Sequence, residues 1–149
     1  MGTTAHLAIR NAVAALLTAP PALAGGFVQA GRAFPLPTDK TQGIYVRLQA
    51  SPGQQPFVGD GRTDWSTTLL ITCVARGDAG VDGETAVDGL LYDTYARLAA
   101  AAPPANADGL VVVPGLDWDV DEADTTLGAA TFRIQVQHRT ASGSLDTAA

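Results

Sequence analysis

The chain has 149 residues, enough for a single domain with a substantial core. Its 46% hydrophobic and 16% charged residues are typical of a globular protein and not of a disordered chain. Nine basic residues against 15 acidic ones give a net charge of −6, which disfavours a protein that grips nucleic acid by its phosphates. A protein whose acidic surface lets DNA pass without binding it is still compatible with this charge.

The cysteine content and the lengths of the apolar runs exclude further classes of protein. Cys73 is the only cysteine, so no intrachain disulfide can form. No apolar run approaches the roughly 20 residues that span a bilayer, so we expect no membrane association. The Ala-rich opening up to Leu17 imitates a signal peptide, but its apolar side chains share one helical face, which favours a helix of the folded domain.

The opening of the chain predicts a helix and then a strand. Thr3 or Thr4 can cap a helix that has one apolar stripe, and Pro20 ends it. Residues 22–43 are rich in glycine and proline. Within them a short apolar stretch, 27–34, indicates a first strand or a loose hairpin.

Two strands of alternating polarity follow. The segment 44–48 has the period of a half-buried strand. The segment 64–76 is partly apolar on both faces, with Trp65 as a core anchor, so we expect it in the middle of a sheet. The Gly- and Pro-rich stretch 51–63 between them is predicted to be an exposed, mobile loop.

A second helix and two further strands complete the chain. Asp82 can cap the helix and Pro103 closes it. Its apolar stripe contains Val87, Leu90, Leu91, Tyr95 and Leu98. An apolar run at 110–113 precedes two strands at about 116–124 and 130–139, which the short connection between them predicts to be a hairpin.

The order helix, three strands, helix, two strands predicts an α+β domain. Because each amphipathic helix needs an apolar sheet face to cover, we expect a mostly antiparallel sheet of about four to five strands with both helices packed on one face. The domain is predicted to span residues 1–139, and residues 140–149 to form a flexible C-terminal tail.

The most unusual motif is the acidic run 117–124. In a strand Asp117, Asp119 and Asp121 would point one way, while Trp118 points into the core. Alternate strand residues are about 7 Å apart, whereas Ca²⁺ binds oxygens within about 2.3–2.6 Å. One ion could therefore bridge two of these aspartates but not three. A solvated acidic face is favoured over a metal site, and over a glycosidase pair, because no acid stands apart in an apolar pocket.

The sequence also offers few candidates for a catalytic nucleophile or its base. Cys73 lies on the apolar face of a predicted strand, where a free cysteine behaves as a small hydrophobic residue. His6 falls in the first helical turn and His138 at the end of a strand, both typical of surface or partly packed histidines. No nucleophile elbow, zinc-protease helix or phosphate-binding glycine loop occurs. We therefore expect no enzyme and no cofactor.

Four features of order and spacing bear on function. They are an Ala/Leu-rich opening helix followed by Gly31-Arg32, the strand 44–48 with the segment 64–71 after a loop, the helix 86–98 with Asp88 and Tyr92, and an Asp-rich strand before the final strand 130–137. The pattern resembles the tail terminator proteins of long-tailed bacteriophages, such as that of phage lambda, over most of the chain. It departs from the lambda protein in a longer 51–63 loop, a Pro-rich 34–37 segment and an extended C-terminal tail.

The resemblance implies a virion structural protein. Tail terminators form a homo-hexameric ring that caps the tail tube, stops its polymerisation and joins it to the head-completion (stopper) proteins of the neck. DNA passes through the lumen without sequence-specific binding. The implied location is the tail or neck of the virion, after assembly in the host cytoplasm.

Two sets of residues become candidates for these contacts. The acidic lumen would be lined by Asp117, Asp119, Asp121, Glu122 and Asp124. An assembly loop would contact ring neighbours or the tube through Gln54, Gln55, Phe57, Asp60 and Arg62. Two alternatives stay open: another phage neck connector or tail-tube subunit with a related sheet, and a small hydrolase or metal-binding domain.

Overall fold

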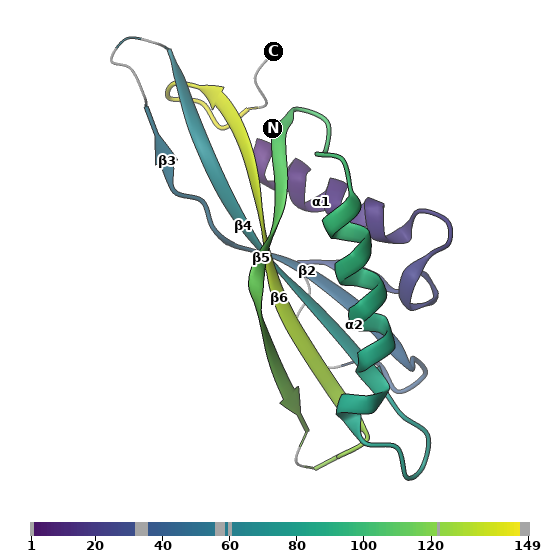
Figure 1. The fold of residues 1–149 in the computed structure, drawn as a ribbon. Coiled ribbons are helices and arrows are strands. Elements are labelled where there is room, and N and C mark those ends of the chain that lie inside the picture. The colour runs from purple at the N-terminus through teal and green to yellow at the C-terminus, as the bar shows by residue number, and fades with distance from the viewer. Residues whose placement is uncertain (1, 32–35, 56–58, 60, 122, 147–149) are drawn as a thin grey trace.

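The protein is an α+β domain, as predicted, in which two helices lie against one side of a twisted sheet (Figure 1). The computed structural model describes residues 2–31, 36–55, 59, 61–121 and 123–146. In chain order the elements are α1 (Ala5–Thr18), a short 3-10 helix η1 (Leu23–Gly26), β1 (Val28–Ala30), β2 (Gln42–Ala50), β3 (Gly53–Gln54), β4 (Arg62–Arg76), α2 (Gly83–Ala100), β5 (Ala107–Val120) and β6 (Leu127–Ala141).

The strands form a six-stranded mixed sheet in the order β1-β2-β4-β6-β5, with β3 paired to β4 off this path. β1 runs parallel to β2, and the other pairings are antiparallel. The prediction of a mostly antiparallel sheet of about four to five strands is therefore corrected. β1 has three residues and β3 has two, so neither is long enough to display an alternating pattern.

β4 is the central strand. Its residue Ile71 pairs with Val46 of β2 on one side and with Phe132 of β6 on the other. All three side chains are fully buried, and so are their neighbours on the same face, Leu69 and Ile134. This apolar sheet face forms one side of the hydrophobic core.

The helices begin and end where the sequence predicts. The Thr4 hydroxyl accepts a hydrogen bond from the N–H of Leu7 at 3.1 Å, and α1 stops before Pro20. The Asp82 carboxylate accepts from the N–H of Thr85 at 3.2 Å. Both caps satisfy N–H groups that the first helical turn leaves without partners.

Both helices contribute to one core on the same sheet face. The cluster contains Ile9, Val13 and Leu17 of α1 and Val87, Leu90, Leu91 and Leu98 of α2, packed on β2, β4 and β6. The opposite face has a smaller buried cluster of Leu36, Tyr45 and Val74 at one end. Along the rest of that face the central strands carry mostly polar side chains.

β5 joins two segments that the sequence predicts separately. The apolar run 110–113 and the acidic segment lie on one strand, with a bulge between Val113 and Asp117 where Pro114 and Gly115 interrupt the register. The strand ends at Val120, so Asp121 and Asp124 belong to the turn that follows.

Trp118 is not a core anchor, which corrects the prediction. Its side chain is on the helical side of β5 but is 52% exposed. β5 is the last strand of the sheet, so no further strand of the described chain covers the indole.

β6 continues to Ala141, past the domain boundary at residue 139 that the sequence predicts. Thr140 is fully buried, and the N–H of Ala5 donates to the carbonyl of Leu145 at 2.7 Å. Within the described ranges, neither helix combines the length and hydropathy of a bilayer-spanning segment.

Two glycines let α2 approach β6. A Cβ on Gly83 would lie 2.6 Å from the backbone nitrogen of Gly128, closer than side-chain carbons come to backbone. Gly83→Ala is therefore expected to lower the free energy of unfolding by about 1–3 kcal/mol, because the helix start must move away from the strand.

Gly89→Ala is the matched control. Gly89 lies in the same helix, and a Cβ there meets no atom within 4 Å, so the substitution should stabilise the helix by about 0.5–1 kcal/mol. Urea denaturation measures both changes. Equal effects at the two positions would contradict the close packing of α2 on β6.

Candidate functional site

The acidic run is split between a strand and a turn. Asp117 and Asp119 pair with Thr131 and Ala129 and are exposed on the sheet face that the helices leave open. Asp117 also forms an ion pair with Arg133 at 3.3 Å. These two carboxylates form a solvated acidic face, the interpretation that the strand spacing favours.

The turn aspartates have local structural roles. Asp121 accepts a hydrogen bond from the N–H of Ala123 at 2.9 Å. Asp124 accepts from the hydroxyl of Thr126 at 2.6 Å and pairs with Arg76 at 3.7 Å. The Thr126 hydroxyl, the Thr126 N–H and then the charge of Arg76 lower the pKa of Asp124.

The described acidic side chains of this run do not gather into a metal-binding cluster. Across the part of the chain that the structure describes, no three His, Cys, Asp or Glu side chains gather closely enough to hold an ion. Glu122, the remaining member of the predicted lumen set, lies outside the described residues.

The predicted assembly loop is partly a hairpin. Gln54 is in β3 and pairs with Asp64, while Arg62 already belongs to β4 and pairs with Ala141. Gln55 donates a hydrogen bond to the hydroxyl of Ser142 at 2.7 Å. Phe57 and Asp60 lie outside the described residues.

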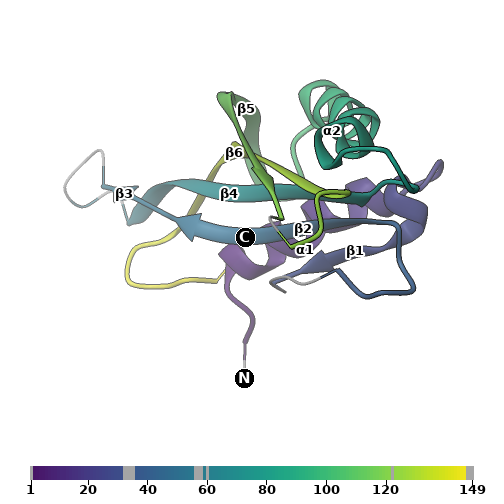
Figure 2. The same ribbon diagram turned by 90° about the horizontal axis from the view of Figure 1, so that it is seen from below.

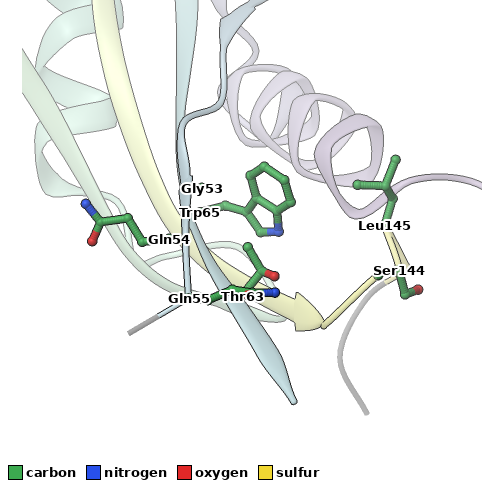
Figure 3. A pocket seen from close by; sticks show the side chains of 8 residues that line it. Gly53, Gln54, Gln55, Thr63, Trp65, Ser144 and Leu145 are labelled. Atoms are coloured by element: carbon green, nitrogen blue, oxygen red, sulfur yellow. The ribbon is translucent and has the colours of Figure 1, made fainter. Parts of the chain in front are cut away.

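A hollow of about 510 Å³ lies beside this hairpin (Figure 3). The indole of Trp65 is at its centre, with Thr63 and Gln54 on one side and Leu145 on the other. The described residues that line it include no acidic, basic, histidine or cysteine side chain. They provide apolar surface and hydrogen-bonding groups.

A second hollow, of about 360 Å³, separates α2 from β5. Its lining is mostly apolar and consists of Asp88, Leu91, Tyr92, Tyr95, Ala96, Leu116 and Trp118. We call it the α2–β5 groove. Tyr92 is 75% exposed and Leu116 is 39% exposed, so the groove presents more apolar surface than its surroundings. The sequence gives no sign of this groove, because the alternation of the strand predicts that Trp118 points into the core.

A buried polar cluster lies under the start of α1. His138 is 2% exposed, and its Nε2 is 2.6 Å from the hydroxyl oxygen of Thr67. Ser51 donates to that same oxygen at 2.9 Å, so the three polar groups form one hydrogen-bonded chain. The His6 ring contacts the rings of His138 and Trp65, edge to face, each at 4.8 Å between centroids.

The position of His138 at the end of a strand predicts a surface or partly packed side chain, and its burial corrects this prediction. The signal was present in the alternation of β6, because His138 continues the buried series of Phe132, Ile134 and Val136. Its Nδ1 has no hydrogen-bond partner within the described part of the chain. Burial of this ring without a partner for Nδ1 disfavours the charged imidazolium.

Cys73 is buried in the core as predicted. Burial raises the pKa of its thiol to about 12, although a hydrogen bond with Thr94 opposes this shift. The reactive thiolate is therefore suppressed at neutral pH.

Comparison with known proteins gives the fold and no family. A scan of protein families and a search of curated proteins each find no match. Among solved structures, the chain is similar to a chain in the virion of a native gene transfer agent particle, with a TM-score of 0.59 and 15% identity. The likeness covers 89% of this chain and 95% of that one, so the two share a fold over nearly their whole lengths.

The histidine cluster predicts how stability depends on pH. Burial lowers the pKa of His138 to about 4; the nearby His6 lowers it further and Asp108 opposes this. Burial also lowers the pKa of His6. Between about pH 6.5 and 4 the unfolded chain therefore binds more protons than the folded one. The contribution of His138 is complete above pH 6.5 and is lost as the pH falls to 4, by on the order of 2–3 kcal/mol.

Urea denaturation at pH 7 and pH 4.5 measures this loss. His138→Gln keeps a polar group beside Thr67 but does not titrate, so its stability should change much less between the two pH values. The pKa values of Asp82 and Asp124 are lowered below 3.8, so neither titrates in this window. An undiminished loss in His138→Gln would contradict the assignment.

Proposed function

We propose that the chain is a virion structural protein of the tail terminator type. In this proposal, six copies form a ring that caps the tail tube, stops its polymerisation and joins it to the head-completion protein of the neck. The observation that carries the proposal is the fold shared, over nearly the full length of both chains, with a chain of a virion particle. The order and spacing of the sequence elements support the finer assignment.

The distribution of polar groups supports a structural role and not catalysis. The titratable groups with the most perturbed pKa values, Cys73 and His138, are buried and do not line either of the two hollows described above. Among the described residues that line those two hollows there is no paired acid and base, the usual requirement for general acid–base chemistry. We therefore propose that the protein is not an enzyme.

The charge of the chain fits the passage of DNA. A ring of six chains would carry about −36, and an acidic lumen repels phosphates, so DNA passes without adhering. Asp117 and Asp119, exposed on the open sheet face, are the described residues best placed to line such a lumen. The protein would act in the virion tail or neck after assembly in the host cytoplasm.

Negative-stain imaging and tube growth test the role directly. We expect the purified protein to form six-fold rings and, when added to tail-tube protein, to shorten the tubes in proportion to its concentration. A tail-tube subunit would instead be incorporated and lengthen the tubes. A neck connector that binds only the head side would leave tube length unchanged. Either of these results rejects the terminator.

The lumen has its own test. A variant with Asp117, Asp119 and Asp121 all changed to Asn keeps hydrogen-bond acceptors and removes three charges from each chain. Rings of this variant should retain short duplex DNA at low salt at least tenfold better than the wild type. The control changes Asp39, Asp78 and Asp146 to Asn, which removes the same charge at other exposed positions. Equal DNA retention in the two variants, or an outer-rim position of residues 117–121 in a ring, overturns the lumen assignment.

A further inference from the structure

Charge is distributed very unevenly along the chain. Residues 1–50 contain four basic residues and one acidic residue, for a net charge of +3. Residues 78–124 contain 11 acidic residues and one basic residue, for a net charge of −10. The remaining segments nearly balance.

The fold places these two segments at opposite edges of the sheet. The first provides α1, β1 and β2, and the second provides α2 and β5. The strand order puts β1 at one edge and β5 at the other, as Figure 2 shows. The uneven distribution of charge along the sequence therefore gives the folded protein one basic edge and one acidic edge.

The central cations are already paired within the chain. Arg133 binds Asp117, Arg76 binds Asp124, and Arg139 lies between Asp64 and Asp108. In contrast, no carboxylate of the described residues forms an ion pair with Arg10, Lys40 or Arg47 of the basic edge. The unpaired positive charge is thus concentrated there.

Each edge also has exposed apolar surface. At the acidic edge it is the α2–β5 groove, where Tyr92, Leu116 and Trp118 surround a hollow next to Asp88. At the basic edge it is the outer half of β2, Arg47–Ala50. All four of these residues are exposed, including Leu48 at 40%, since β1 pairs with β2 only as far as Val46.

We propose that the α2–β5 groove receives the β1–β2 edge of a second copy, so that subunits join head to tail. Charge decides between the two ways in which identical chains can pair. A two-fold contact through the groove would bring two strongly acidic surfaces together, which costs several kcal/mol. A head-to-tail contact joins acidic to basic and apolar to apolar. Such contacts close into rings when the rotation between subunits allows it. This inference rests on the proposed ring.

Two single-surface variants test the contact. Trp118→Lys removes the aromatic anchor of the groove and adds a positive charge, and Arg47→Glu reverses the exposed cation of the basic edge. Each should weaken self-association at least tenfold. Asp78→Asn, which adds the same charge as Trp118→Lys in the exposed turn before α2, should assemble like the wild type. Circular dichroism verifies that all variants fold.

Mixing the two variants gives the decisive result. Trp118→Lys keeps an intact basic edge and Arg47→Glu keeps an intact groove, so the mixture should form a one-to-one heterodimer and nothing larger, measured by native mass spectrometry. Raising the salt concentration should weaken it. A mixture that stays monomeric, homodimers of either variant, or rings formed by each variant alone would overturn the inference. So would a wild-type chain that stays monomeric up to its solubility limit.

The same proteins separate the contact from the terminator role. Wild-type rings that disappear in both variants but never stop tube growth reject the terminator and keep the head-to-tail contact. Rings that persist in both variants and still stop tube growth reject the contact and keep the terminator.

Discussion

Burial of one face of β4 fixes where the helices and the other strands lie. This strand is hydrogen-bonded to β2 and β6 along most of its length, and its residues Leu69, Ile71 and Cys73 are fully buried. Both helices pack on the face that these residues share. Because α1 covers β2 while α2 covers β4 and β6, the central strand sets the positions of both outer edges. The surfaces that we propose for assembly are therefore held by the core and do not depend on flexible segments.

Local rules predict the parts of the fold that local interactions determine. The caps at Thr4 and Asp82 and the alternation of β2 and β4 are visible in the sequence because each reflects neighbouring residues. The α2–β5 groove and the exposure of Trp118 are not visible, since they depend on β5 having no strand beyond it. The burial of His138 follows from the alternation of β6, but the polarity of the residue argued against it.

Only part of the structure of the acidic run 117–124 can be predicted from the sequence. Spacing predicts that Asp117 and Asp119 share one strand face, and both are exposed there. It does not reveal that Asp121 and Asp124 bind the backbone and side chains of their own turn, because the end of β5 depends on its pairing with β6. The spacing also does not reveal that the two edges of the sheet differ in charge. This difference arises because the strand order places the basic and acidic segments at opposite edges.

The bulge in β5 has a consequence for the free subunit. An exposed strand of 14 residues with outward Val111 is a template on which other chains can add strands and aggregate. Pro114 has no N–H to donate, and the register shift between Val113 and Asp117 breaks the ladder into two short halves. An incoming strand can follow only one half at a time. The protein thus keeps an open edge without offering a continuous seed for amyloid-like stacking.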